Sequence, residues 1–530
     1  MRRSYEPAIV KAVAFRVWVA GVRHLIRLAL TVALLTAGTA PSRAHWCGDC
    51  EYIIPHIFHH HHPLVASPAN HGFSDNFSAH GLSGFGGFAA GAVGAAAVAP
   101  MIATIVLGRE LTVAEFWRLE MSMFLGPAGW YLADRMFPPR HGGAPGQPPS
   151  QGGSNINHPP RGEIHFVPNE VLIVFAPGTP PAYIARLAAR LGLTVLDTQS
   201  FGLTGITVVR FGITNGRSLA SILRALARYA RIVAAQPNYL YLLQQGAPML
   251  AREAGSDGAA AQYVVDKLHL RQAHQISDGD NVGVAVIDSQ IDRAQPELTG
   301  SIAADFDAVG GQPTPHPHGT AIAGAIAAHA MLIGVAPKVK LYAARVFTGS
   351  GDSAQGTTFN ILKGLDWAAS ENVRVVNMSF AGPADPLMRI TLRKAYAHGT
   401  VLVAAVGNAG PRARPLYPAA YPEVIGVTAT DADNKTMAQA NRGQQVTVAA
   451  PGVDVIEPAP NDRYQITSGT SVAAAHVSGV AALLLARDPA LKPDAVKRIL
   501  TRSAQALHRP AREVGAGEID ALAALKALAR

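Results

Sequence analysis

The sequence predicts an α/β protein whose largest unit is a doubly wound, mostly parallel sheet with flanking helices. A small α+β unit of ferredoxin-like type and a low-order N-terminal region precede it. From about residue 263 onward, short apolar runs alternate with alanine-rich stretches of helical character. Apolar runs of this kind are typical of strands buried on both faces, and their alternation with helices is typical of a parallel sheet. Gly and Pro are densest before about residue 165, which predicts that the low-order part is N-terminal.

Composition limits the classes of protein that the chain can belong to. The 530 residues are 49% hydrophobic and 15% charged, which is ordinary for globular protein and predicts two or three folded units. The formal charge of +9 would favour nucleic acid or anionic lipid if it were concentrated. No Lys/Arg run and no basic stripe with interleaved aromatics is found, so we predict no nucleic-acid partner.

Residues 1–44 have the pattern of an export signal. A basic leader that includes Arg2 and Arg3 precedes the apolar run Leu28–Ala37, and Ser42-Arg43-Ala44 is a small-residue cleavage context. The protein is therefore predicted to be exported: secreted, periplasmic or on the outer side of a membrane. Because the basic leader is long, an uncleaved anchor is the alternative.

Residues 45–83 form a His/Gly-rich linker with Cys47, Cys50 and the run His59–His62. Two interpretations remain open for it. The cysteines and histidines are ligand types for zinc or copper, which would make the chain a metal-handling envelope protein. The other is an unstructured linker with one local disulfide. No cysteine follows Cys50, so the folded part must be stable without disulfides.

Residues 84–137 are predicted to form an apolar hairpin. Its arms are Gly87–Gly108 and Phe116–Phe137, and both are rich enough in apolar residues to enter a membrane. Two crossings would leave Arg109 and Arg118 near the inner turn, as the positive-inside rule prefers. A soluble hairpin packed on itself is the alternative. Residues 138–162 are a Pro/Gly-rich linker.

Residues 163–245 alternate strands and helices in the order βαββαβ, which is typical of a small ferredoxin-like sandwich. The helix over 218–229 has Leu219, Ile222, Leu223 and Leu226 on one face. We expect Pro237 to end the last strand. The predicted strands are Glu170–Phe175, Leu193–Asp197, Gly205–Phe211 and Ile232–Gln236, and the other helix is Pro181–Leu191.

A linker over 246–262 leads to the unit over 263–530. Its predicted strands are Val282–Ile287, Val339–Ala343, Val373–Met378, Val401–Val406 and Val424–Ala429. Open α/β sheets place their functional sites beyond the carboxyl ends of such strands.

Four polar residues lie at the ends of elements in this unit. Asp288 directly follows a strand, Asn408 follows another inside Gly-Asn-Ala-Gly, and His318 precedes the small-residue helix Ala321–Ala328. Ser471 begins a helix within Ser-Gly-Thr-Ser-Val-Ala-Ala-Ala-His. Taken singly, each has an ordinary role as a helix cap or turn residue.

The surroundings of Ser471 favour a nucleophile. Gly469 and the alanines after Ser471 remove side chains beside it, so a carbonyl carbon could approach within about 3 Å. A helix N-terminus also offers partial positive charge to a developing oxyanion.

The order Asp, His, Ser along the chain, with Asn between His and Ser, is that of subtilisin. The sequence resembles the subtilisin-like serine proteases over about residues 263–525. The matching blocks are Val284-Ala-Val-Ile-Asp-Ser-Gln-Ile-Asp292, His318-Gly-Thr-Ala-Ile-Ala-Gly324, Val375-Val-Asn-Met-Ser-Phe-Ala-Gly382, Ala404-Ala-Val-Gly-Asn408 and Gly469-Thr-Ser-Val-Ala-Ala-Ala-His-Val-Ser-Gly479.

The resemblance implies a serine endopeptidase acting on polypeptide substrates. It implies that Asp288 orients His318, that His318 takes the proton of Ser471, and that Asn408 and the Ser471 N–H hold the oxyanion. It also implies that catalysis requires no cofactor. Structural Ca²⁺ is an expectation from the family, with ligands unknown. The edges implied to bind an extended peptide are Gly349-Ser350-Gly351 and Ser379-Phe380-Ala381-Gly382.

The resemblance also implies that residues 163–245 are a prodomain that inhibits the protease intramolecularly. The stretch Gln236–Tyr241 resembles the tail with which such prodomains fill the cleft. We therefore predict a self-processed precursor, cut between Tyr241 and Gln262. A catalytically silent subtilisin-like binding or envelope module is the alternative.

Three positions depart from the family pattern. Gln290 stands where Gly usually follows Asp-Ser, Ala381 replaces a Gly, and Ala475 replaces a Pro. None of them removes a catalytic atom. Gln290 requires an unstrained φ or a tolerated left-handed geometry at its turn.

Overall fold

The computed structural model describes residues 156–244, 249–251, 262–349 and 354–528. All of them lie in the larger of two compact units, Leu82–Arg530. The predictions for the signal, the His/Gly-rich linker, the apolar hairpin and most of the 138–162 linker fall outside the described residues. Most of them fall into an N-terminal α+β unit (156–244) and a C-terminal α/β unit (262–528).

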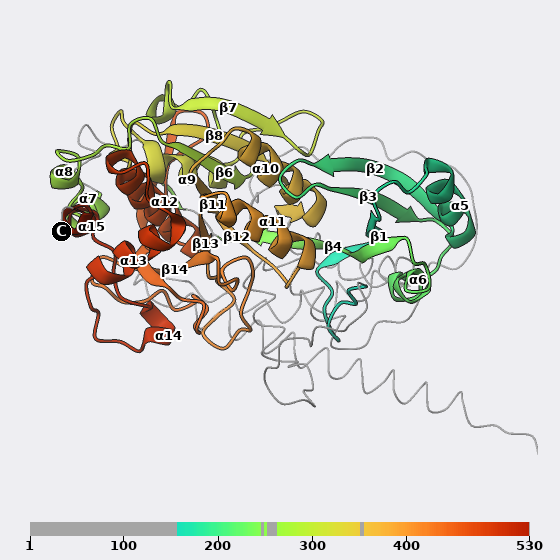
Figure 1. Cartoon of the computed structure of the whole chain (residues 1–530). Helices are drawn as coiled ribbons and strands as arrows, with labels where there is room; N and C mark the ends of the chain where they lie inside the picture. The colour runs from blue at the N-terminus through green and yellow to red at the C-terminus, as the bar shows by residue number, and fades with distance from the viewer. Residues whose placement is uncertain (1–155, 245–248, 252–261, 350–353, 529–530) are drawn as a thin grey trace, which may run out of the picture. The chain divides into compact units, whose positions relative to one another are not determined.

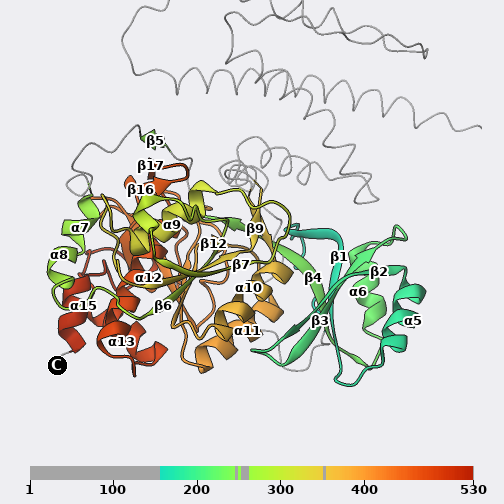
Figure 2. The same cartoon turned by 90° about the horizontal axis from the view of Figure 1, so that it is seen from above.

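The N-terminal α+β unit has the predicted order βαββαβ (Figure 1). Its four strands form an antiparallel arrangement in the order β2-β3-β1-β4, and the two helices pack on one face of it (Figure 2). Apolar residues at helical spacing drive this packing, as Leu219, Ile222, Leu223 and Leu226 of α6 are all buried. The elements are β1 (Phe166–Phe175), α5 (Pro181–Leu191), β2 (Leu193–Phe201), β3 (Ile206–Ile213), α6 (Leu219–Leu226) and β4 (Ile232–Leu243).

The prediction that Pro237 ends the last strand is wrong, because β4 continues to Leu243. Pro has no N–H to donate, and the register between β1 and β4 shifts near Pro237. Beyond that point β4 pairs with β1 only at Tyr239, opposite Phe166, within the described register. It pairs instead with two short strands of the C-terminal α/β unit, β10 (Gln355–Thr357) and β12 (Phe380–Ala381).

The C-terminal α/β unit is built on a parallel sheet in the order β15-β14-β13-β11-β6-β8-β7. Both faces are covered: in β6, Val284 and Val286 contact one apolar cluster, while Ala285 and Ile287 contact another. This explains why the strands read as continuous apolar runs. The strands are β6 (Gly283–Asp288), β7 (Ile302–Asp307), β8 (Lys340–Arg345), β11 (Val375–Met378), β13 (Val401–Ala405), β14 (Val424–Thr430) and β15 (Val448–Pro451).

Helices lie on both faces of this sheet (Figure 1). One face is covered by α9 (Pro317–Ala327) and α12 (Thr470–Arg487), which pack against each other, and the other by α10 (Thr358–Ser370) and α11 (Pro386–Ala397). The remaining helical elements are α7 (Tyr263–Lys267), α8 (Leu270–Ala273), η1 (Pro296–Leu298), α13 (Pro493–Ser503), α14 (Ala511–Val514) and α15 (Ala521–Leu528).

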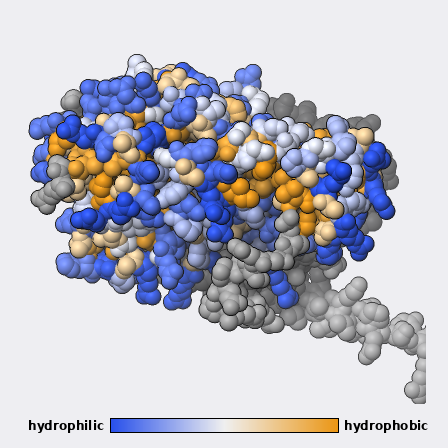
Figure 3. All heavy atoms as spheres, viewed as in Figure 1, coloured by the Kyte–Doolittle hydropathy of each residue, from blue (hydrophilic) through white to orange (hydrophobic). Residues whose placement is uncertain are grey.

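Among the described residues, α12 alone is long and apolar enough to cross a membrane, but 89% of that stretch is buried inside the fold. It is the central helix of the core. The face drawn in Figure 3 carries apolar side chains in separate patches among hydrophilic ones.

A third, antiparallel sheet joins β16 (Val455–Ala459), β17 (Arg463–Thr467) and β5 (Met249–Ala251). β17 leads directly into α12. The two-residue strand β9 (Phe347–Thr348) pairs with β10.

Candidate active site

Asp288 and His318 form a buried hydrogen-bonded pair at the carboxyl edge of the parallel sheet. Asp288 is the last residue of β6, and its Oδ1 lies 2.7 Å from Nδ1 of His318. The backbone N–H and the hydroxyl of Ser289 donate to the same oxygen at 2.7 and 2.9 Å. The carboxylate therefore fixes the imidazole ring with Nε2 turned away from it. This Nε2 has no hydrogen-bond partner within the described part of the chain.

His318 lies in the first turn of α9, which begins one residue earlier, at Pro317. The next residue, Gly319, explains how the helix comes so close to β6. A Cβ atom at Gly319 would lie 2.5 Å from the backbone oxygen of Ser289, closer than real Cβ contacts. The absence of a side chain at Gly319 thus lets the imidazole reach Asp288.

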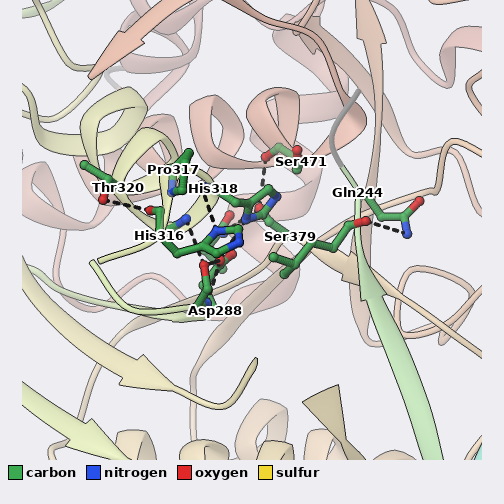
Figure 4. Close-up of polar contacts among 12 residues, drawn as sticks. Gln244, Asp288, His316, Pro317, His318, Thr320, Ser379 and Ser471 are labelled. Atoms are coloured by element: carbon green, nitrogen blue, oxygen red, sulfur yellow. Dashed lines mark hydrogen bonds and ion pairs between the residues drawn. The ribbon is translucent and has the colours of Figure 1, made fainter. Parts of the chain in front are cut away.

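Ser471 is the second residue of α12 and is fully buried. Its Oγ has no hydrogen-bond partner among the described residues. The Ser471 carbonyl is fixed by Ser379, whose hydroxyl donates to it at 2.9 Å. The same hydroxyl accepts from the Asn377 amide at 2.8 Å. Figure 4 draws Ser471 and His318 in one close-up, on the packed helices α12 and α9.

Asn408 is oriented by Thr470, the residue before Ser471. Its Oδ1 accepts hydrogen bonds from the Thr470 backbone N–H at 3.2 Å and from the Thr470 hydroxyl at 2.8 Å. The side-chain NH₂ is left as a buried donor with no partner in the described structure. An amide donor held beside a helix N-terminus suits stabilisation of an oxyanion.

The end of β4 enters this site as an extended peptide. Leu240–Leu242 pair with β10 on one side, and Leu242 and Leu243 pair with β12 on the other. The next residue, Gln244, donates its backbone N–H to the Ser379 carbonyl at 3.2 Å. Its own carbonyl oxygen accepts a hydrogen bond from the backbone N–H of Ser471 at 3.3 Å.

The side chain of Gln244 adds a further contact with the site. Its Oε1 accepts from the backbone N–H of Asn408 at 2.8 Å, and its Nε2 donates to the Leu242 carbonyl at 3.0 Å. Figure 4 shows Gln244 in the same close-up as Ser379 and Ser471. Gln244 therefore touches both residues expected to bind the oxyanion. Sequence reasoning did not single it out, because a Gln after a strand carries no pattern of its own.

The two expected substrate-binding edges differ in how they lie relative to β4. Phe380 and Ala381 of the edge Ser379–Gly382 form β12 and pair with β4 as an added strand would. Gly349 follows β9, while Ser350 and Gly351 lie outside the described residues. On the side of β4 opposite β12, the strand that pairs with it is β10, which lies further along the chain than Gly349. A strand of three residues shows no periodicity, which explains why the sequence did not reveal it.

The departures from the expected pattern are accommodated. Gln290 is not among the residues with positive φ, so it does not adopt the left-handed geometry that would favour Gly. Ala381 lies buried in β12 opposite Leu242, and Ala475 is fully buried inside α12. Among the described residues, no group of three or more His, Cys, Asp or Glu side chains converges to hold a metal ion. The calcium expectation thus gains no candidate ligands there.

Comparison with known proteins agrees with this geometry. The model of the subtilase family matches residues 279–517. Subtilisin DY of Bacillus licheniformis is 37% identical over 234 residues, which cover 43% of this chain and 84% of that protein. Thermitase of Thermoactinomyces vulgaris is 35% identical over 234 residues, which cover 43% of this chain and 82% of that protein.

Two further matches extend the comparison. Subtilisin E of Bacillus subtilis (strain 168) is 39% identical over 224 residues, covering 40% of this chain, and the match spans only 57% of that protein's length. The crystal structure of fervidolysin from Fervidobacterium pennivorans matches with a TM-score of 0.60 at 24% identity, covering 70% of this chain and 62% of fervidolysin. At this identity the match shows the fold alone.

A parallel sheet with a buried Asp–His pair, a serine at a helix N-terminus and an oriented amide defines the class of subtilisin-like serine proteases. The chain belongs to the subtilase family.

Proposed function

We propose that the protein is a serine endopeptidase, made as a precursor that cuts its own chain between Gln244 and Gln245. The observation that carries the proposal is the hydrogen bond from the Ser471 N–H to the Gln244 carbonyl, at the end of a strand held between β10 and β12. This is the pose of a peptide whose carbonyl is presented to a nucleophile.

In the proposed reaction, His318 Nε2 takes the proton of the Ser471 hydroxyl while Oγ attacks the substrate carbonyl. Asp288 accepts a hydrogen bond from Nδ1 of His318. This leaves Nε2 of His318 free to act as the base, and the carboxylate stabilises the imidazolium that forms. The Ser471 N–H and the Asn408 NH₂ donate to the oxyanion, and His318 returns the proton to the leaving amine. Water then hydrolyses the acyl-enzyme with His318 acting again as base.

The N-terminal α+β unit acts as an intramolecular inhibitor in this proposal. Its last strand lies between β10 and β12, and side chains of the C-terminal α/β unit hold the N-terminal α+β unit in place. Asp366 of α10 accepts from the backbone N–H groups of Gly202 and Leu203 at 3.1 and 2.8 Å. Gln236 of β4 donates its amide to Asp385 at 2.7 Å. After the cut, these contacts keep the unit bound until it dissociates or is degraded.

Export is part of the same proposal and rests on the sequence. The basic leader, the apolar run Leu28–Ala37 and the Ser42-Arg43-Ala44 context support a removable signal. Intact mass of the exported precursor of the Ser471→Ala variant tests it. A new N-terminus at His45 is expected, and a retained residue 1 would favour an anchor.

A fluorophosphonate probe tests the nucleophile. After processing, it should label the wild type and the control variant Ser468→Ala, whose hydroxyl is hydrogen-bonded to Asp454 in the described part of the chain. Ser471→Ala should not be labelled. Absence of labelling in a processed, folded wild type would favour the silent binding module over the protease.

A further inference from the structure

Tyr241 is the fourth residue before the proposed cut, counting Gln244 as the first, and its side chain is completely buried. Two phenylalanines of the C-terminal α/β unit form the apolar wall around it. The ring of Tyr241 meets that of Phe380 edge-on, with centroids 5.7 Å apart, and Phe380 in turn contacts Phe347 at 5.3 Å. The pocket is therefore shaped for an aromatic ring.

Gly382 determines whether this pocket exists. A Cβ atom at Gly382 would lie 2.5 Å from Cδ1 of Tyr241, so any side chain there would occupy the space of the ring. Gly356, opposite Tyr241 in β10, leaves similar room for the ring of Phe347. Gly382 thus leaves the volume that the Tyr241 ring fills, and Gly356 leaves the volume for the Phe347 ring in the wall beside it.

The far end of the pocket is polar. The hydroxyl of Tyr241 has two buried acceptors within reach, the Pro383 carbonyl at 3.2 Å and Asp385 Oδ2 at 3.4 Å. Besides the bond from Gln236, Asp385 has two bonds within the C-terminal α/β unit: its Oδ1 accepts from the Met388 N–H at 3.1 Å and its Oδ2 from the Thr358 hydroxyl at 2.6 Å. Thr358 and Met388 belong to the C-terminal α/β unit, so they hold the carboxyl whether or not β4 is bound.

We propose that this pocket makes the processed enzyme select tyrosine over phenylalanine at the fourth residue before the cut, with Asp385 as the specificity-determining residue. The proposal rests on the endopeptidase function proposed above. A phenylalanine would fill the apolar walls but leave buried oxygen acceptors facing a ring edge that cannot donate. Sites built to bind a hydroxyl reject the analogue without it for this reason.

Three matched peptides test the proposal on the processed wild type. Each ends in Leu-Leu-Gln before a fluorogenic leaving group, and each carries Tyr, Phe or O-methyltyrosine before Leu-Leu-Gln. The kcat/KM for the Tyr peptide should exceed that for Phe by about tenfold or more. O-Methyltyrosine, which is larger and cannot donate, should be worse than Tyr by at least as much. Equal cleavage of Tyr and Phe would overturn the proposal.

Two variants assign the effect to residues. In Asp385→Ser the helix cap of α11 is preserved, because Ser is also a good N-cap, but its shorter side chain withdraws from the tyrosine hydroxyl. The preference for Tyr over Phe should fall by about threefold or more, with the Pro383 carbonyl left as the remaining acceptor. Gly382→Ala should weaken cleavage of both aromatic peptides relative to a matched Ala peptide. A Tyr preference unchanged in Asp385→Ser would remove Asp385 as the selector.

The outcomes distinguish failure of the tyrosine selectivity from failure of the endopeptidase function on which it rests. If none of the peptides is cleaved and the fluorophosphonate probe does not label Ser471, the endopeptidase function fails. If all peptides are cleaved without discrimination, the function stands and the tyrosine pocket fails. Should Asp385→Ser not fold, the three peptides on the wild type still decide the selectivity.

Discussion

The backbone N–H of Ser471 donates a hydrogen bond to the carbonyl oxygen of Gln244 at 3.3 Å, although the two residues are more than two hundred positions apart in the chain. This contact joins the N-terminal α+β unit to the first turn of α12. In the proposed function it marks the carbonyl that Ser471 would attack, and the groups that hold this geometry give rise to the following predictions.

Removal of the Asn408 amide should impair catalysis far more than substrate binding. In Asn408→Ala the oxyanion loses one of its two donors, and such losses typically lower kcat by ~10²–10³. The KM of a peptide substrate should change little, because the amide acts on charge that develops in the transition state. Steady-state kinetics of the processed variant check this, and a pure KM effect would contradict the assigned role.

A methyl group at Gly319 should disconnect His318 from Asp288. The Cβ atom would meet the Ser289 carbonyl at 2.5 Å, so α9 must move away from β6. Self-processing of Gly319→Ala should slow by about 100-fold or more, because misplaced catalytic groups are costly. Gly202→Ala is the control, since no atom lies within 4 Å of its added Cβ and its φ is not positive. Wild-type processing by Gly319→Ala would refute this reason for the glycine.

Loss of Asp366 should shorten the inhibited phase after the cut. Asp366→Ala leaves the Gly202 and Leu203 N–H groups without their acceptor, which weakens docking of the N-terminal α+β unit. Probe-reactive Ser471 should appear about fivefold to fiftyfold sooner after processing. Glu371→Ala, at the C-cap of the same helix and without a hydrogen bond to that unit in the described residues, should behave as wild type. An identical delay in both variants would exclude Asp366 as a docking residue.

The buried His476 should make the fold less stable in mild acid. Burial lowers the pKa of His476 to about 4, so between about pH 6.5 and pH 4 the unfolded chain binds a proton that the folded protein does not. Stability from this group is therefore lost as the pH falls from 7 to 5, by on the order of 2 kcal/mol. In the Ser471→Ala background, His476→Gln should reduce the difference between urea unfolding at pH 7 and pH 5. An unchanged difference would contradict a neutral buried imidazole.

Glu457 should act with the opposite sign. Burial raises the pKa of Glu457 well above its usual range, so above about pH 4.5 the unfolded chain releases a proton that the folded protein retains. Its contribution is present in acid and is lost as the pH rises. Glu457→Gln, which mimics the neutral acid, should therefore stabilise the Ser471→Ala protein more at pH 7 than at pH 5. Urea unfolding at both values checks the sign, and a larger gain at pH 5 would contradict it.

Much of the fold could be predicted because local pattern and tertiary structure agree. Helix α5 has the predicted bounds, and the strands buried on both faces were visible as apolar runs. Strand β7 was missed, because an edge strand with alternating burial from Ile302 to Asp307 lacks such a run. The continuation of β4 past Pro237 depends on partners more than a hundred residues away.

The candidate site was predictable to the same extent. Asp288, His318, Asn408 and Ser471 could be named because each lies at or near the end of an element, and because their order and the blocks around them resemble the subtilisin-like serine proteases. The structure pairs the first two directly. Gln244 and Asp385 could not be named, since their roles arise only when β4 lies between β10 and β12. They belong to the site because of where the tertiary structure places them, and no sequence motif marks them.

Intact mass spectrometry of the first products of self-processing tests the central claim most directly. The wild-type precursor should yield one fragment that ends at Gln244 and another that begins at Gln245, either as glutamine or as pyroglutamate, while Ser471→Ala stays uncut. A first cut elsewhere with the Gln244–Gln245 bond intact, or the same cut in Ser471→Ala, would contradict the account.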